Sequence, residues 1–460
     1  MKRLLAFVIF LAAFLFAVFP CGAEEALFPA RGENGLWGFL DRTGAFALPA
    51  QFASVSPWMG RYAAVSADGE RFGIIDGAGH FALPMEYDIT WLEGGQGHLF
   101  QVMDSQSELI PALALLCGDQ TVGFFDGDTG LFSGFAWKWA ALPWFDKELI
   151  PVLDEALLWG YASRKTGEIV IPCQFREAEE FRGDWAFVTL PDREAENGKP
   201  AFISRQGEKA LAPSGYTLDA YTRAGDGLFV VYEENERFGY MNAAGDIVIP
   251  TRYAAAYPFH GSWAVVEDTE GNYRYIHRDG SLLPGVTARP EGRGGYEFVN
   301  GLTSVFVGGQ PGAMNEQGEI LWTLEGENIF WLWNFMENGL AWYMEWHPEA
   351  GEGWYEQLYY GLADSQGRFL TESVFPAVLQ EEGSPFREGL AAVRGEEGWG
   401  YIDETGAWAI PQRYAAARSF ENGLALVEKR SGERGYIDAQ GHEIYFWQGA
   451  EETPFWHLLE

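Results

Sequence analysis

Basic residues are scarce in this sequence. Its 460 residues include 31 Lys and Arg against 66 Asp and Glu, so the formal net charge is −35. Nucleic-acid binding depends on neutralising phosphates with basic side chains, and docking on an anionic membrane surface depends on the same positive charge. The composition therefore argues against both of these partners.

Cysteine is also rare, since the sequence contains only Cys21, Cys117 and Cys173. Three cysteines in a chain of this length are not the framework of a disulfide-rich domain. Cys117 and Cys173 could pair in an oxidising compartment, or they could be two separately buried thiols. The sequence leaves both alternatives open.

The sequence lacks the common catalytic and metal-binding signatures. Its seven histidines form no His-x-x-x-His or His-Glu-x-x-His pair, and there is no Gly-x-Ser-x-Gly elbow, phosphate loop or dinucleotide fingerprint. The segment 126–130, Asp-Gly-Asp-Thr-Gly, resembles the start of a calcium loop, but the position of the closing Glu is occupied by Trp137. We therefore expect no metal, no cofactor and no catalytic residues.

Long apolar runs are absent except at the N-terminus. Lys2 and Arg3 precede an apolar run over residues 4–19, which is short for a membrane span of roughly 20 residues. Pro20 ends the run, and small residues follow up to Ala23. This pattern predicts a secretory signal peptide over residues 1–23, and hence an extracytoplasmic protein with no membrane span after cleavage. An uncleaved anchor and a lipoprotein acylated at Cys21 are the alternatives.

The rest of the sequence, residues 24–460, is rich in aromatic residues (16%) and glycine (57 residues), and it is repetitive. One motif recurs in the same order: Trp-Gly-Tyr-Ile-Asp, a Gly, Ile-Pro, an aromatic residue, and a run such as Gly-Leu-Ala-Leu-Val. The residues that define it in the clearest copies are Trp37, Gly38, Gly44, Trp159, Gly160, Gly245, Trp399, Gly400, Asp403 and Gly406.

Eleven glycines mark the same position in successive copies. They are Gly44, Gly79, Gly130, Gly167, Gly207, Gly245, Gly280, Gly318, Gly367, Gly406 and Gly441. Their spacing is near 38 residues except for two longer intervals, which predict inserts near residues 88–122 and 322–360.

This order of residues resembles the bacterial WG-repeat family over essentially the whole chain after residue 23. The resemblance implies a β-rich repeat protein. It implies no family-wide catalytic residues.

Each unit is expected to form three short antiparallel strands. Asp403 and Gly406 occupy the first and fourth positions of a type I turn between two of them. Gly400 within a strand would allow a neighbouring strand or ring to pack on the backbone, and Pro411 would end the third strand. Strands that are apolar on both faces must be covered on both faces, so neighbouring units are expected to stack.

The sequence thus predicts an all-β array of about eleven three-stranded units. Propellers typically have roughly four to eight blades of about 40–45 residues. We therefore expect an open superhelical array, with a propeller-like ring as the alternative.

The segment 322–360 departs from the repeat and contains many aromatic residues beside glutamates. Aromatic faces next to carboxylates suit stacking on sugars or gripping cationic peptides. The alternative is that the rings fill the core of a degenerate unit. The candidate ligand-binding residues are Trp331, Trp333, Trp342, Tyr343, Trp346 and Trp354.

Together these features predict an exported, non-enzymatic repeat protein that binds a protein or a glycan at the cell envelope or outside the cell. A glycan-active enzyme is the second hypothesis. It would use carboxylates of the aromatic segment, with Glu345 and Glu356 as the first residues to test. A structural spacer without a ligand is the third.

Overall fold

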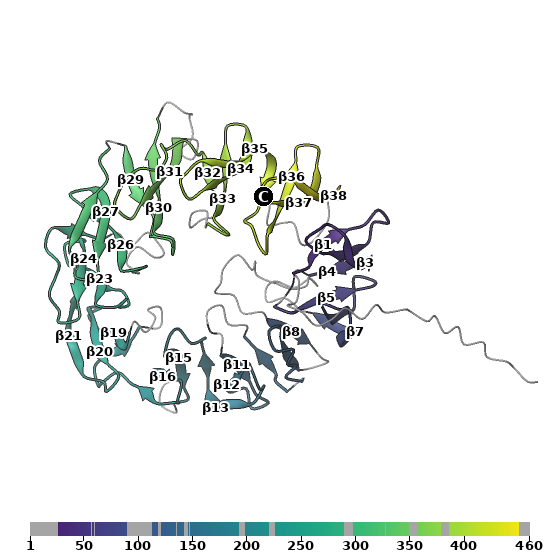
Figure 1. Ribbon diagram of the computed structural model, residues 1–460. Coiled ribbons are helices and arrows are strands. Elements are labelled where there is room, and N and C mark those ends of the chain that lie inside the picture. The colour runs from purple at the N-terminus through teal and green to yellow at the C-terminus, as the bar shows by residue number, and fades with distance from the viewer. Residues whose placement is uncertain are drawn as a thin grey trace, which may run out of the picture.

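The computed structural model describes residues 26–56, 58, 60–89, 113–117, 121–134, 136–141, 146, 148–192, 198–219, 226–288, 298–326, 328–348, 357–378 and 386–449. Within these ranges there is no α-helix, and the strands form nine sheets. Figure 1 shows the sheets side by side in chain order around a ring, with the first and last sheets as neighbours. The predicted all-β class is confirmed. The predicted signal peptide lies outside the described residues.

The sheets of the first half of the chain are antiparallel and are built from consecutive strands. They are β1 (Phe28–Arg31), β2 (Trp37–Leu40) and β3 (Phe46–Phe52); β4 (Ser54–Val55), β5 (Tyr62–Ser66), β6 (Phe72–Asp76), β7 (Phe81–Ile89), β8 (Leu113–Cys117) and β9 (Val122–Asp126); β10 (Trp139–Ala140), β11 (Leu149–Leu153), β12 (Trp159–Ser163) and β13 (Ile169–Phe175); β14 (Glu177–Ala178), β15 (Trp185–Leu190), β16 (Lys199–Ser204) and β17 (Lys209–Ala210); and β18 (Thr217–Leu218), β19 (Leu228–Tyr232), β20 (Phe238–Asn242) and β21 (Ile247–Tyr253).

The second half continues in the same way. Its sheets are β22 (Ala255–Ala256), β23 (Trp263–Glu267) and β24 (Tyr273–His277); β25 (Val286–Thr287), β26 (Leu302–Val307), β27 (Gln310–Asn315) and β28 (Ile320–Thr323); β29 (Ile329–Leu332), β30 (Leu340–Trp346) and β31 (Leu358–Asp364); and β32 (Ala377–Val378), β33 (Leu390–Gly395), β34 (Gly398–Asp403), β35 (Trp408–Ala417), β36 (Leu424–Lys429), β37 (Glu433–Asp438) and β38 (Glu443–Gln448).

The prediction of about eleven separate three-stranded units is not confirmed, for two reasons. First, most units begin with an additional strand, often of only two residues, such as β14 before β15. Second, one long strand can belong to two units: β35 pairs with β34 through Tyr414 and with β36 through Ala416. Strand β7 joins two units in the same way, so two of the nine sheets contain more than one repeat.

We call each repeat unit a blade and its additional first strand the inner strand. Figure 1 shows that the chain runs outward within a blade, for example from β11 to β13 and from β19 to β21. The inner strand therefore lies toward the centre of the ring, and the last strand of a blade forms the outer wall.

All eleven predicted turn glycines are found in turns. Their φ angles lie between 71° and 86°, a region that favours glycine because it has no Cβ. The turn at Asp403 is typical, since Asp403 Oδ1 accepts hydrogen bonds from the N–H of Thr405 at 2.9 Å and of Ala407 at 3.1 Å. Gly406 N–H donates to the Asp403 carbonyl at 2.9 Å, which closes the predicted turn.

The glycine of each Trp-Gly pair is required by close backbone packing. A Cβ on Gly38, Gly160 or Gly400 would lie 2.6–2.7 Å from backbone atoms of the following strand. That strand bulges at its Ile-Pro or Leu-Pro pair, and the bulge brings the two backbones together. Trp37 is buried, and Trp159 and Trp399 are half-buried.

The prolines of the Ile-Pro and Leu-Pro pairs are exposed on the outer wall. Proline cannot donate a ladder hydrogen bond, so these positions discourage another strand from adding to the sheet. They are Pro49, Pro84, Pro172, Pro250 and Pro411.

Neighbouring blades are joined by shared cores and by a recurring tyrosine hydrogen bond. The tyrosine of the Trp-Gly-Tyr motif donates its hydroxyl to a carbonyl of the next blade: Tyr161 to Glu179 at 2.7 Å and Tyr401 to Arg418 at 2.6 Å. The aromatic residues thus fill the space between sheets, as the sequence predicts.

A related contact, from a motif tyrosine to a carbonyl of β1, joins the last blade to the first. Tyr436 donates to the Pro29 carbonyl at 3.0 Å, and one core cluster contains Trp37 and Trp447, whose rings are 6.1 Å apart. The expected open superhelix is therefore not confirmed, and the propeller-like ring describes the structure. Closure depends on the rotation between neighbouring blades, which neither the number of units nor their length reveals.

Candidate functional site

The aromatic segment 322–360 forms most of the blade that contains β29, β30 and β31. The other predicted insert, 88–122, falls largely outside the described residues, apart from its ends and strand β8. The described candidate site is therefore built on this one blade, and its aromatic residues face in different directions.

Trp342 and Tyr343 are core residues. Trp342 is 1% exposed, stacks on Phe386 at 6.4 Å and meets Phe375 edge-on. Tyr343 is 3% exposed and donates its hydroxyl to the Thr371 carbonyl at 2.9 Å. Consecutive residues of a strand point to opposite faces, so the two rings fill the cores on either side of the blade. Neither ring is accessible to a ligand.

The remaining candidates do not form a single aromatic patch. Trp331 is half-buried, and its ring lies 5.8 Å from that of Phe306 in the preceding blade. Trp333 is also half-buried and belongs to the same core cluster as Trp342. Trp346 is 37% exposed. Trp354 lies outside the described residues. Of the six candidates, Trp346 is the described residue most available to a partner.

A polar cluster lies beside Trp346, where β30 ends. The hydroxyl of Ser373 donates to Glu345 Oε2, and Ser373 Oγ lies 2.8 Å from His347 Nε2. His347 Nε2 is also 3.5 Å from Glu345 Oε2, and its ring packs against Tyr359 at 4.8 Å. Ser373 is buried, whereas the side chains of Glu345 and His347 are partly exposed.

This cluster has the residue types of a serine hydrolase triad but not its geometry. In a triad, the serine and the carboxylate contact different nitrogens of the imidazole. Here Ser373 and Glu345 both contact Nε2 of His347, and the serine proton points toward the carboxylate. The arrangement fixes the end of the hairpin, and it leaves one carboxylate, Glu345, partly exposed.

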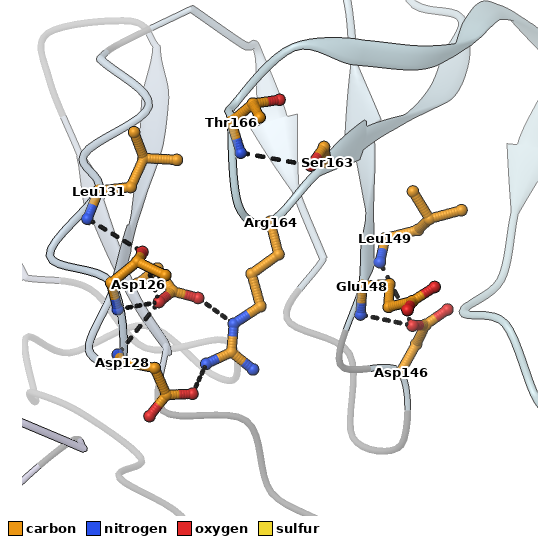
Figure 2. Close-up of polar contacts among 10 residues, drawn as sticks. Asp126, Asp128, Leu131, Asp146, Glu148, Leu149, Ser163, Arg164 and Thr166 are labelled. Carbon is orange, nitrogen blue, oxygen red and sulfur yellow. Dashed lines mark hydrogen bonds and ion pairs between the residues drawn. The ribbon is translucent and has the colours of Figure 1, made fainter.

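A second polar cluster joins two blades on the face that carries the glycine turns. Figure 2 shows Arg164, which follows β12, reaching between Asp126 and Asp128 of the preceding blade. Arg164 Nε donates to Asp126 Oδ2, and its Nη2 lies 2.6 Å from Asp128 Oδ2. Arg164 and Asp126 are buried, with side chains 4% and 1% exposed.

The turn geometry of Asp126 explains this pairing. Its Oδ1 accepts hydrogen bonds from the N–H of Thr129 at 2.7 Å and of Asp128 at 3.1 Å, which leaves Oδ2 for the guanidinium. The two carboxylates of the segment that resembles a calcium loop are therefore paired with one arginine. Across the described ranges, no group of three or more His, Cys, Asp or Glu side chains is placed to hold a metal ion.

Arginines at the same turn position make comparable links elsewhere. Arg205 pairs with the buried Asp146 at 3.0 Å, lies over the Phe181 ring at 4.9 Å and donates to the Gly183 carbonyl at 2.7 Å. Arg278 lies over the Phe259 ring at 5.5 Å and donates to the Gly261 carbonyl at 2.9 Å. These arginines stabilise contacts between and within blades, and the repeat pattern alone does not predict them.

Titratable side chains of the repeat form hydrogen bonds that stabilise the fold. Hydrogen bonding to Thr405 lowers the pKa of Asp403 and holds the turn carboxylate in its charged form. Burial raises the pKa of the Tyr401 hydroxyl well above its usual value, and burial likewise raises that of Tyr343. Both tyrosines are hydrogen-bond donors at neutral pH.

Across the described ranges, no helix has the length and apolar character needed to cross a membrane. No curated protein matches the chain. Among solved structures, it is similar to the computationally designed protein Ika8, with 11% identity over 65% of this chain and 95% of that one and a TM-score of 0.31.

Two further solved structures are similar to this chain. BamB from Moraxella catarrhalis matches with 11% identity over 76% of this chain and 96% of that one, with a TM-score of 0.31. A structure described as the eukaryotic initiation factor matches with 10% identity over 76% and 95%, with a TM-score of 0.34. Scores this low support no conclusion about function.

A family model described as "WG containing repeat" matches residues 159–190, 238–273 and 399–431. These segments contain the motifs at Trp159, Phe238 and Trp399, which are among the clearest copies in the sequence. These three segments are WG repeats, and they support the resemblance of the chain to the WG-repeat family.

Proposed function

We propose that this protein is an exported, non-enzymatic scaffold that binds a protein partner at the cell envelope or outside the cell through the outer wall of its ring. The observation that carries the proposal is a set of exposed apolar side chains on last strands of blades. These outer-wall residues are Phe81, Ile169, Val170, Val248, Ile320, Leu321 and Trp408.

The chemistry of the outer-wall residues favours a protein over a glycan. Five of the seven outer-wall residues are aliphatic and offer no aromatic face for a sugar ring, and only Phe81 and Trp408 carry an aromatic ring. Repeated apolar positions on an otherwise acidic surface are typical of protein interaction sites. The exposed prolines oppose strand addition, so the partner would contact side chains rather than extend a sheet.

The test compares charged variants of the mature protein. Val170→Glu combined with Val248→Glu places two carboxylates on the outer wall, and Leu36→Glu places one on a similarly exposed apolar residue that lies outside the last strands. A partner is captured by crosslinking on intact cells of the source organism and then titrated against purified variants.

The outer-wall variant is expected to weaken binding by about tenfold or more, while the Leu36 variant binds like the wild type. Equal affinity for all three proteins would contradict the outer-wall assignment. Capture of glycan alone would favour a glycan-binding role. If nothing saturable is captured, the spacer hypothesis replaces the binding scaffold. Fractionation of the cells tests export.

The glycan-active enzyme has one observation in its favour, which is the partly exposed Glu345 carboxylate in a blade that also exposes Trp346. Glycoside hydrolysis usually requires a second carboxylate across the scissile bond. The other glutamate named from the sequence, Glu356, lies outside the described residues. Loss of a glycan-cleaving activity in Glu345→Gln, with binding retained, would support this function.

A further inference from the structure

The last strand of the last blade, β38, has an edge that the repeat protects in other blades. β38 pairs with β37 and is the terminal strand of its sheet, on the outer side of β37 (Figure 1). In the described part of the chain, no other strand pairs with it. Unpaired backbone groups on such an edge can pair with another chain, and proteins protect their edges with prolines and β-bulges.

The protective proline has a fixed place in the repeat. It lies five residues after the turn glycine, as Pro411 does after Gly406. It also follows the residue that pairs with the third position of the Trp-Gly-Tyr motif, as Ile410 pairs with Tyr401. The prolines at the same place in other blades are Pro49, Pro84, Pro172 and Pro250.

In the last blade a phenylalanine occupies this place. The same count from the turn glycine Gly441 reaches Phe446. The residue before it, Tyr445, pairs with the motif residue Tyr436, as the repeat requires. Phe446 has the backbone N–H that a proline lacks, so the first of the two protective devices is absent from β38.

The bulge is reduced as well. The last strands with the proline shift their register twice against the preceding strand. β38 shifts once, before Tyr445, and is then in regular register as far as Gln448. Strand β28 also lacks the proline, but it ends at the corresponding residue, Thr323. β38 therefore extends beyond this place with a regular edge.

The register shows which backbone groups lie on that edge. Gly449 N–H donates to the Gly432 carbonyl at 3.2 Å, in line with the ladder between β37 and β38. In an antiparallel ladder, alternate residues direct their backbone groups to the same neighbour. Trp447 therefore faces β37, whereas the N–H and C=O groups of Phe446 and Gln448 face outward.

These outward groups are complementary to those of a second copy of the chain. Two β38 strands in antiparallel orientation can place Phe446 of one copy opposite Gln448 of the other. The reverse pair then forms about the same two-fold axis. Each pair exchanges its N–H and C=O groups, so the sheets of the two rings become continuous.

The charges of β38 also favour a second copy over a basic peptide. A net charge of −35 opposes association of two copies wherever unpaired carboxylates meet. β38 contains one charged residue, Glu443, and its carboxylate lies 2.8 Å from Lys429 Nζ. Lys429 Nζ also lies 3.8 Å from the centre of the Phe446 ring. The strand thus carries no unpaired carboxylate to repel a copy or to attract a basic segment.

We propose that β38 pairs in antiparallel orientation with β38 of a second copy, with Phe446 opposite Gln448, so that two rings form a dimer. The outer-wall residues assigned above to a protein partner lie on other strands. This inference therefore goes beyond the proposed function, and failure of either proposal leaves the other unaffected.

A pair of variants at one position tests the edge. Phe446→Pro introduces the proline of the other blades and removes the outward N–H, which makes no bond in the ladder to β37. Phe446→Ala is the matched control, because it also loses the ring but keeps the N–H. Sedimentation equilibrium of the mature protein over about a hundredfold range of concentration measures association. We expect wild type and Phe446→Ala to dimerise, and Phe446→Pro to dimerise about tenfold or more weakly, since each dimer loses two hydrogen bonds.

Hydrogen exchange in the wild type locates the interface. The amides of Phe446 and Gln448 should exchange about tenfold or more faster when the dimer is diluted to monomer, because their acceptors belong to the other copy. The Trp447 amide faces β37 and serves as the internal control, so its exchange should not change.

Three outcomes would overturn the proposal. A protein that is monomeric at every concentration has no such interface. Equal dimerisation of Phe446→Pro and Phe446→Ala would place the interface elsewhere. Slow exchange of the Phe446 amide in the monomer would show that another part of the same chain covers the edge. If Phe446→Pro fails to fold, Gln448→Pro with Gln448→Ala as its control removes the second outward N–H and keeps the test decisive.

Discussion

The blade built around Trp399 and the blade built around Trp342 place a glycine at the same position for different reasons. Gly400 makes room for a backbone, since its Cβ would lie 2.6 Å from the Ile410 carbonyl oxygen. Gly361, which follows Tyr360 in β31, makes room for a side chain: its Cβ would lie 2.2 Å from the ring of Tyr343.

The difference follows from the last strand of each blade. In the Trp399 blade, the Ile-Pro bulge of β35 presses on β34. The Trp342 blade has no Ile-Pro pair, and only isolated bridges from Phe369 and Phe375 cover β31. A large buried ring thus occupies the space that backbone fills elsewhere. Regular repeats depend on backbone fit, and the irregular blade depends on side-chain volume.

The largest expected effect is on the irregular blade. Trp342→Ala removes a ring that is 1% exposed and should lower the free energy of unfolding by about 4 kcal/mol. Urea denaturation followed by circular dichroism measures this. Loss of less than about 1 kcal/mol would show that the ring is not part of the core.

Gly400→Ala tests the regular blade. Its new methyl group meets backbone atoms, which cannot rotate away, so we expect a loss of about 3 kcal/mol. Gly69→Ala is the control for an added methyl group, because a Cβ at Gly69 meets nothing within 4 Å. Its φ of 83° makes this control itself mildly unfavourable, so only a clearly greater loss at Gly400 supports the backbone argument.

Alkaline pH should weaken both blades through their buried tyrosines. Burial raises the pKa of Tyr401 and Tyr343 in the folded protein, whereas an unfolded tyrosine loses its proton near pH 10. Above about pH 10, the unfolded state binds fewer protons, so the free energy of unfolding falls by up to ~1.4 kcal/mol per pH unit for each such tyrosine.

Tyr401→Phe and Tyr343→Phe should each make this decline shallower. Urea midpoints collected between about pH 8 and 11 measure the slope. If either substitution leaves the slope unchanged, the corresponding hydroxyl has the same pKa in the folded and the unfolded protein.

Gly361→Ala should have a smaller effect than Gly400→Ala, at about 1–2 kcal/mol. Its methyl group meets the far end of the Tyr343 side chain, which can shift. Combining it with Tyr343→Leu should recover part of the loss, because the clashing ring is then absent. Additive effects in this double variant would contradict direct contact.

The smallest expected effect on stability comes from Trp346→Ala. This side chain is 37% exposed, so the free energy of unfolding should fall by about 1 kcal/mol, less than at the buried positions. The same variant tests the aromatic segment as a ligand site. A loss of partner or glycan binding with no greater loss of stability would locate a binding surface at this hairpin.

The repeat made much of the fold predictable. The positions of the turn glycines, the Asp403 turn and the close packing at Gly400 follow from local residue types at fixed spacing. The inner strands were missed because pairs such as Ala255–Ala256 carry no strand pattern. Ring closure was predicted only as the alternative, since contacts such as Tyr436 to Pro29 join residues more than 400 positions apart.

The site was less predictable than the fold. Aromatic enrichment in segment 322–360 did not distinguish the buried Trp342 from the exposed Trp346. Residues 342 and 346 lie on the same face of β30, so alternation does not separate them; Trp346 differs because it is the last residue of the strand. Ser373 and Glu345 meet because a later part of the same blade crosses the end of β30, and no spacing rule connects the two.

The repeated tyrosine contact has a consequence for how the chain could be cut and rejoined. The joint between the last and first blades uses a tyrosine hydroxyl-to-carbonyl bond, as do the joints after Tyr161 and Tyr401. Its chemistry is therefore of the kind that joins other blades. A circular permutant that links the present termini and opens the chain between two other blades should assemble the same ring, whereas adding or removing one repeat would change the rotation needed at every joint.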